Sequence, residues 1–187
     1  KLAKDAPNPF EQRAALIESY VHCDSGRPTI AIPTIGALSG HIPWLATFAK
    51  ELGFFVQGLQ SESSSLADGE QLNNSFDSCG PVKIAHAVCD TDAELLFFPK
   101  IMTIADPSGD GGQTCVSAQA LPEMIEQSLK WRGKNVKVIR PIVSFTDGFD
   151  APALLENMMA VADELGIDPG RIGPAVGAAA RAQAQYE

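Results

Sequence analysis

The sequence predicts an α/β domain with a doubly wound, mostly parallel open sheet and flanking helices. Short apolar runs rich in β-branched or aromatic residues recur along the chain, each bounded by Gly, Pro or polar turn residues. Such runs are typical of strands buried on both faces of a parallel sheet. Between them lie longer stretches with apolar residues at helical spacing, and strands that alternate with helices in this way form parallel sheets.

The first half of the chain supplies two of the expected strands. Asn8 and Pro9 form a helix start before apolar residues at helical spacing, and Gly53 is a helix stop signal. In order, we expect a helix over 8–22, a strand over 28–33, a loop over 36–40, a helix over 41–52, a strand over 54–59, a polar loop over 61–65 and a helix from 66 to 72.

The second half supplies two more strands. Pro81 suits a first helical turn, where its missing N–H costs nothing, and Gly133 ends a later helix. In order, we expect a helix over 82–88, a strand over 94–99, a glycine-rich loop over 106–114, a helix over 120–131, a strand over 136–141, a helix over 150–165 and an alanine-rich helix over 169–185. This alternation indicates a sheet of the Rossmann or flavodoxin type.

The length of 187 residues predicts one main domain with appended helices. We expect residues 1–24 to form an N-terminal helix that packs on the domain, and residues 25–150 to form the α/β domain itself. Residues 151–187 are expected to form C-terminal helices. Because the chain starts at Lys1 and stops after Tyr186 and Glu187, we expect these helices to continue into a larger protein.

Charge and composition exclude several classes of partner. A net charge of −9 argues against nucleic acid, which requires a basic surface. The chain contains neither an apolar run of about 18 residues nor the pattern of a signal peptide, so we expect no membrane association and a cytoplasmic location. The four cysteines form no CxxC pair, and free thiols in a reducing compartment are therefore expected.

Cys79 and Cys115 are the strongest chemical signal in the sequence. Each stands close to an expected helix start, where the helix dipole and free N–H groups stabilise a thiolate. Cys115 also lies beyond the carboxyl end of a strand, where doubly wound sheets bind ligands. The pair is a candidate site for metal ligation or nucleophilic chemistry. The alternative is coincidence, with each cysteine a small buried hydrophobic residue.

Lys83 and His86 are candidate auxiliary residues. They stand three positions apart on one expected helix and so share a face, from which they could assist a thiolate or an anionic ligand. The alternative is a partly exposed lysine and a histidine with an ordinary structural role. A zinc site made by His86 and Cys89 lacks further ligands. His86 as a base for Cys79 is disfavoured, because seven residues span about 10 Å along a helix.

Nucleotide-binding motifs are missing from the two glycine-containing loops. The loop over 108–113 lacks the GxxxxGK[ST] order, and the loop over 36–40 is not GxGxxG. His41, a lone histidine near a helix start, is interpreted as structural. The sequence thus gives no reason to expect ATP or NAD binding by these residues.

Five segments resemble one known domain. They are residues 28–33, 41–59, the cysteine motif 78–86, the strand 94–101 and the second cysteine motif 114–122. The domain is found in 2-hydroxyglutaryl-CoA dehydratase activators and acyl-CoA dehydratase activase-related proteins. It is similar, more distantly, to the 2-hydroxyacyl-CoA dehydratase subunits and to double-cubane cluster proteins. The resemblance covers about residues 9 to 150.

The resemblance implies iron–sulfur chemistry and low-potential electron transfer. Carried over by position, Cys79 and Cys115 become ligands of a 4Fe–4S-type cluster. Lys83 and His86 would then modify the properties of the site through the ligands, without binding the metal themselves. The implied partners are ATPase activase domains of the same or a partner chain, and an acyl-CoA dehydratase. The alternative is a non-catalytic scaffold or docking module that has lost the cluster, and on either interpretation this chain alone is not expected to be a complete enzyme.

Overall fold

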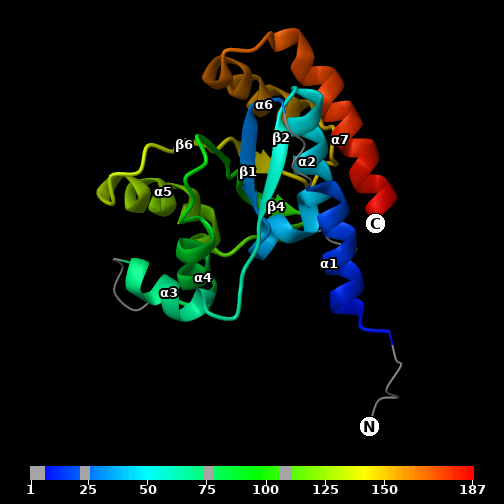
Figure 1. Ribbon diagram of the computed structural model, residues 1–187. Helices are drawn as coiled ribbons and strands as arrows, with labels where there is room; N and C mark the ends of the chain where they lie inside the picture. Colours follow the sequence, from blue (N-terminus) through cyan, green and yellow to red (C-terminus); the bar gives the residue numbers. More distant parts are fainter. Residues whose placement is uncertain (1–6, 22–25, 74–77, 106–110) are drawn as a thin grey trace.

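A computed structural model of the chain describes residues 7–21, 26–73, 78–105 and 111–187 (Figure 1). Its main sheet consists of β1 (Thr29–Pro33), β2 (Phe55–Leu59), β3 (Leu95–Phe97) and β6 (Lys137–Ile139), all parallel, in the order β2-β1-β3-β6. The chain therefore leaves β1 toward one edge and later returns to build the other edge. This is the predicted doubly wound α/β fold.

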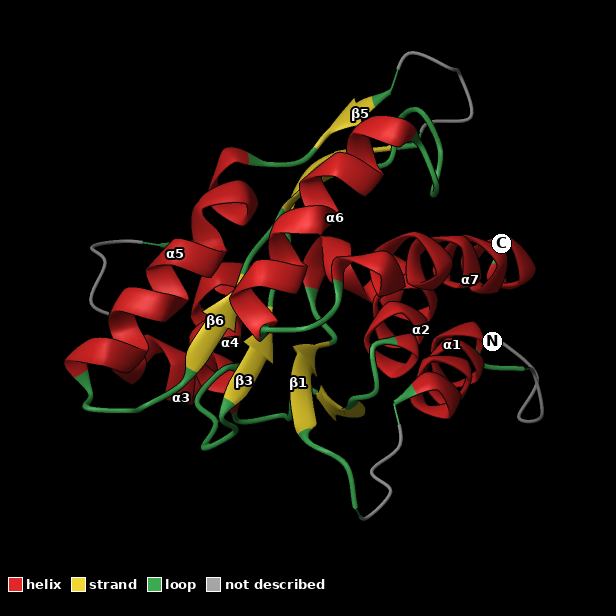
Figure 2. Ribbon diagram, turned by 90° about the horizontal axis from the view of Figure 1, so that it is seen from above, coloured by secondary structure: helices red, strands yellow, loops and turns green. Residues whose placement is uncertain are grey.

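Helices cover both faces of this sheet. They are α1 (Pro9–Tyr20), α2 (Ile42–Glu51), α3 (Ser65–Leu72), α4 (Gly80–Val88), α5 (Val116–Trp131), α6 (Pro152–Leu165) and α7 (Ile172–Tyr186), with 3₁₀ segments η1 (Gly36–His41) and η2 (Pro169–Arg171). Figures 1 and 2 show α3, α4 and α5 together on one side, and α1, α2 and α7 on the other. Right-handed crossovers in opposite directions produce this division.

Two strands run on beyond their expected ends. We expected strands to stop at Pro99 and Pro141, but β4 (Lys100–Ile104) continues β3, and β7 (Ile142–Ser144) continues β6. The two prolines stand at facing positions and lack the N–H that a ladder needs. The ladder resumes around them because Phe98 N–H donates to Ile139 O and Lys100 N–H to Pro141 O, each at 2.9 Å.

The glycine-rich loop and the following helix also differ from expectation. Residues 106–110 lie outside the described residues, and β5 (Gly112–Gln113) pairs antiparallel with β4. Helix α5 begins at Val116 rather than at residue 120, with Pro122 inside it. Pro122 costs the helix one backbone hydrogen bond and crowds the carbonyl four residues earlier, but the helix continues through it from the N-cap residue Cys115.

Helix α2 packs against both the sheet and α7, and most of its side chains are buried. Trp44 stacks on Phe48 with ring centroids 5.3 Å apart, and Phe48 in turn stacks on Phe97 of β3 at 5.9 Å. The buried Gln183 of α7 accepts from the Trp44 backbone N–H at 3.3 Å and donates to the carbonyl of Gly40 at 2.8 Å. A buried polar side chain is stable only when its groups are paired, and both ends of this amide are.

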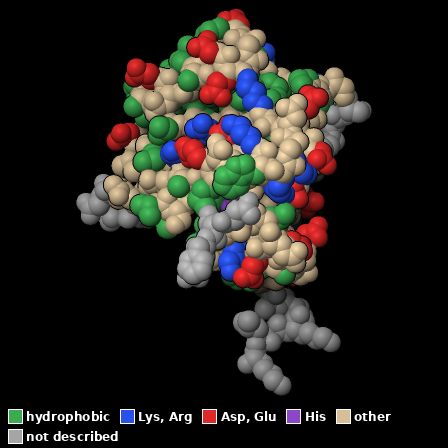
Figure 3. Space-filling model, turned by 90° about the vertical axis from the view of Figure 1, so that its left-hand side faces the viewer, with side chains coloured by type: hydrophobic (Ala, Val, Ile, Leu, Met, Phe, Trp, Pro, Cys, Tyr) green, Lys and Arg blue, Asp and Glu red, His purple; other side chains and the backbone are tan. Residues whose placement is uncertain are grey.

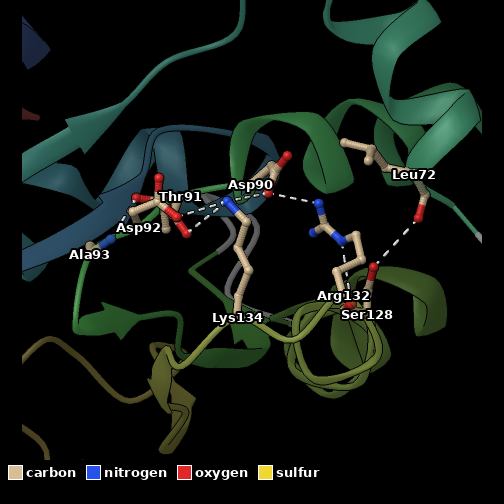
Figure 4. Close-up of polar contacts among 8 residues, drawn as sticks. All are labelled: Leu72, Asp90, Thr91, Asp92, Ala93, Ser128, Arg132 and Lys134. Atoms are coloured by element: carbon tan, nitrogen blue, oxygen red, sulfur yellow. Dashed lines mark hydrogen bonds and ion pairs between the residues drawn. The ribbon is translucent and has the colours of Figure 1, made fainter.

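An ion-pair network ties the end of α4 to the end of α5 (Figure 4). Asp90 pairs with Arg132 at 2.7 Å and with Lys134 at 2.8 Å, while Lys134 also reaches Asp92 at 3.0 Å. Burial acts to raise the pKa of Asp90, but the hydrogen bond from Lys134 and the charges of Arg132 and Lys134 outweigh it and lower that pKa.

The surface carries charges of both signs. Figure 3 shows basic and acidic side chains interspersed on one face of the molecule, and ion pairs join Lys100, Lys130 and Arg140 to glutamates of α5. Among the described residues, no helix is both long and apolar enough to cross a lipid bilayer.

Replacing Gly69 by alanine should destabilise the fold by about 1–3 kcal/mol, because a methyl group there would collide with the Lys83 carbonyl oxygen of α4. Denaturant unfolding measures this change. Gly173→Ala in α7 is the matched control, since nothing lies within 4 Å of its added methyl, and it should be neutral or stabilising by about 0.5–1 kcal/mol. Equal effects of the two substitutions would refute the tight α3–α4 contact.

Asp90→Asn should lower the free energy of unfolding near pH 7 by about 1 kcal/mol. The lowered folded-state pKa means that the carboxylate stabilises above its unfolded pKa of about 3.9 and loses this effect as the pH falls further. The difference between wild type and variant should therefore vanish in acid. Urea titrations from pH 7 to pH 2.5 measure the difference in unfolding free energy. Asp92→Asn is the control, because the Asp92 side chain is almost fully exposed. A difference between wild type and Asp90→Asn that persists at pH 2.5 would contradict the stabilising role of the Asp90 carboxylate.

Candidate functional site

A cavity of about 460 Å³ opens beyond the carboxyl ends of β1 and β3. It is lined by Thr34, Ile35, Gly36, Ala37, Leu38 and Ser39 after β1; by Ser61; by Cys79, Pro81, Val82 and Ile84 at the start of α4; by Phe98, Pro99 and Ile101 after β3; and by Cys115, Ser117, Ala118 and Leu121 at the start of α5.

The position of the cavity follows from the topology. From β1 the chain crosses through α2 to β2 at one edge, and from β3 it crosses through α5 to β6 at the other edge. The two crossovers diverge between β1 and β3, so a crevice opens above these neighbouring strand ends. Doubly wound proteins bind their ligands at this point of the sheet.

Cys79 and Cys115 are brought together at the rim of this cavity. Both line it, both are exposed, and each is the residue that precedes the first turn of its helix. The Cys79 carbonyl accepts from the N–H groups of Val82 and Lys83, which anchors the start of α4. Two thiols from segments far apart in the sequence thus face one space.

The helix start around Cys115 favours its thiolate. The backbone N–H groups of Ser117 and Ala118, followed by the Ser117 hydroxyl, face the sulfur and lower the pKa of Cys115. Its full exposure leaves little desolvation to oppose them. Cys115 is therefore suited to act as a metal ligand or a nucleophile. Ser117 was not identified from the sequence as a site residue. Its position, two residues after a cysteine at a helix start, could have indicated this role.

Lys83 and His86 are not among the residues that line the cavity. Lys83 pairs with Glu70 of α3 at 2.9 Å. His86 is 2% exposed, and neither of its ring nitrogens has a hydrogen-bond partner among the described residues. Burial, and then the charge of Arg132, lower the pKa of His86, so the imidazole is neutral near pH 7. The structure therefore does not bring these two side chains to the rim with the thiols.

The remaining cysteines and His41 have other surroundings. Cys89 is fully buried, and burial raises the pKa of its thiol, which disfavours the thiolate needed for ligation. Cys23 lies outside the described residues. His41 stacks on Phe145 with centroids 4.5 Å apart, and its Nδ1 lies 2.8 Å from the Ala37 carbonyl. His41 thus braces η1, the segment that forms one wall of the cavity.

Gln183 is a second support of that wall that the sequence did not reveal as one. Its bond to the Gly40 carbonyl holds the end of η1 from the C-terminal helix. The signal was available, because Gln183 continues the stripe of buried residues Ile172, Ala175, Val176 and Ala179 along α7 at helical spacing. A polar residue on an otherwise apolar stripe has a specific partner.

The described residues supply two thiols and no larger set of ligands at one place. Nowhere in the described part of the chain do three or more His, Cys, Asp or Glu side chains gather as a metal site. Iron–sulfur clusters are usually held by four thiolates. Cys79 and Cys115 therefore fit half of such a set, and a complete set needs ligands from outside the described residues.

Alkylation should reveal the favoured thiolate of Cys115. We expect its reaction with iodoacetamide to reach half of its maximal rate at a lower pH in the folded protein than in urea, and Ser117→Ala should raise that pH. Mass spectrometry of peptides assigns the modified residue, and the buried Cys89 should react only after unfolding. The same midpoint for Cys115 in folded and unfolded protein would contradict the role of the helix start.

Comparison with known proteins identifies the family of the chain. A family model described as the CoA enzyme activase uncharacterised domain (DUF2229) matches residues 29–187, which include every strand and all the residues that line the cavity. No curated protein and no solved structure matches the chain. The chain belongs to the family of CoA enzyme activase uncharacterised domains.

Proposed function

We propose that this domain binds an iron–sulfur cluster through Cys79 and Cys115 and serves low-potential electron transfer in the activation of a 2-hydroxyacyl-CoA dehydratase, such as the 2-hydroxyglutaryl-CoA enzyme. The observation that carries the proposal is that two exposed cysteines, each at the residue before a helix, line one cavity. Family membership supports the link to CoA enzymes. The cluster is supported by the resemblance of both cysteine motifs to those of the activase-related domain, which is itself distantly similar to the dehydratase subunits.

The residues around the thiols fit this chemistry. When bound, a cluster supplies a one-electron redox centre whose potential depends on the hydrogen bonds to its sulfur ligands and on its exposure. The N–H groups of Ser117 and Ala118 stabilise the negative charge on the Cys115 sulfur. Among the described residues, the cavity walls carry no charged side chain that competes with these dipoles.

The remaining ligands come, in this proposal, from a docked partner: an ATPase activase domain of the same or another chain, which supplies the electron, or the dehydratase that receives it. Apolar surface beside the thiols supports such docking. Val116, next to Cys115, is 76% exposed, and Leu66, which lies against Gly80, is 49% exposed. Exposed apolar side chains at a site with an incomplete ligand set mark an interaction surface.

A scaffold without a cluster is the second candidate. It is favoured by one observation, the lack of any group of three or more metal ligands among the described residues. In this case the domain would contribute its fold and its docking surface, and the thiols would have no bound metal. The two candidates differ in a quantity that can be measured, the content of iron and acid-labile sulfide.

Cys79→Ser and Cys115→Ser should each reduce cluster content to background. Wild type and variants are purified and reconstituted with iron and sulfide without oxygen, and iron, sulfide and the visible absorption are measured. Cys89→Ala is the matched control, because its thiol is buried away from the rim and its loss should leave the cluster intact. Circular dichroism checks that each variant folds.

Two results would count against the cluster. Iron bound at wild-type levels in both serine variants would exclude these thiols as ligands. No iron in the wild type, with Cys79 and Cys115 freely titratable in the presence of the ATPase partner, would favour the scaffold.

A further inference from the structure

We infer that the cavity beneath the two thiols binds an uncharged, mainly aliphatic ligand. The site is formed by the walls of the cavity rather than by the sulfurs at its rim, so the inference goes beyond the proposed cluster and does not require it. It rests on the chemistry of the lining, on the pairing of the polar groups at the rim and on the way the walls are held.

The part of the lining that the described residues form is uncharged and mostly apolar. No Lys, Arg, His, Asp or Glu of the described ranges lines the cavity, whereas Leu38, Phe98, Ile101 and Leu121 do. Its volume of about 460 Å³ is within the range of small-molecule sites. At roughly 30 Å³ for each water-sized group, there is room for about 15 such groups. An ion placed here would lose its hydration without gaining an opposite charge.

Several polar groups of the lining are already engaged within the protein. The hydroxyl of Ser39 donates to the Thr34 carbonyl at 2.9 Å, and the hydroxyl of Thr34 donates to the Leu59 carbonyl at 3.0 Å. The side-chain amide of Gln119 donates to the Thr114 carbonyl at 2.9 Å. These groups have little left to offer a charged or strongly polar ligand, so apolar contact supplies the affinity.

The walls are held in place before any ligand arrives. On one side, Gln183 and His41 fix the η1 segment through its carbonyls. On the other side, Phe98 and Pro99 stand where β3 runs into β4. A cavity with walls fixed in this way loses little conformational entropy on binding, which favours small ligands that only fill space.

Titration with 1-hexanol and with hexylammonium chloride tests the inference. The full chain is labelled at Ile and Leu methyl groups, and NMR follows Ile101 and Leu121. We expect 1-hexanol to shift both resonances and to bind at least about tenfold more tightly than hexylammonium. From 1-butanol to 1-hexanol, the affinity should rise about fourfold for each added CH₂. Equal affinity for the alcohol and the ammonium ion would overturn the inference.

Variants locate the binding. Ala118→Phe fills the cavity from α5 and should abolish the shifts, while Ala120→Phe, an exposed position on the same helix, should leave them unchanged. Ala37→Leu fills the cavity from η1 and is the second test if Ala118→Phe does not fold. Methyl shifts that survive in a folded cavity-filling variant would refute the site.

The Cys79→Ser/Cys115→Ser double variant separates this inference from the cluster. Because the apolar walls keep their shape and only two lining residues change, 1-hexanol should still shift the Ile101 and Leu121 methyl resonances, although this variant holds no cluster. Binding lost with the thiols would contradict a site made by the walls. If the wild-type protein binds 1-hexanol but holds no cluster, the proposed function is contradicted and this inference still holds.

Discussion

The whole site depends on the divergence of two crossovers at β1 and β3. Because the chain leaves this central pair in opposite directions, the connections that follow β1 and β3 separate above the strand ends, and a cavity lies between them. The starts of α4 and α5 border this space. Cys79 and Cys115 share one rim for this reason, although they come from different segments of the chain. The topology thus determines where each cysteine lies, and the backbone groups at the start of its helix determine the chemistry of its thiol.

The cavity also depends on polar bonds inside an otherwise apolar core. Gln183 spans the contact between α7 and the η1–α2 junction, and it pairs with backbone groups on both sides of that junction. Nearby, the Trp44 indole donates to the Phe149 carbonyl at 2.9 Å. Apolar packing alone would let these elements slide, whereas paired buried groups have one favourable arrangement. The C-terminal helix is in this sense part of the site although it lines none of it.

The sequence predicted the fold class and the order of the main strands, because both depend on local patterns of apolar residues. It placed strand ends at Pro99 and Pro141, since a proline lacks an N–H, but only the pairing of the two strands determines whether the ladder resumes. Helical spacing put Lys83 and His86 on one face, but it could not say which neighbour that face meets. The packing of α3 on α4 decides this, and it directs Lys83 to Glu70 and leaves His86 buried.

Because of the close contact at Gly69, the residues that α3 can accept there depend on the position of α4. Any side chain at that position has to push away the α4 backbone at Lys83, one turn after Cys79. A lineage could therefore acquire a larger residue there only together with compensating changes that move α4 and its thiol. The position of the thiol is thus constrained by a residue that touches neither the sulfur nor the cavity.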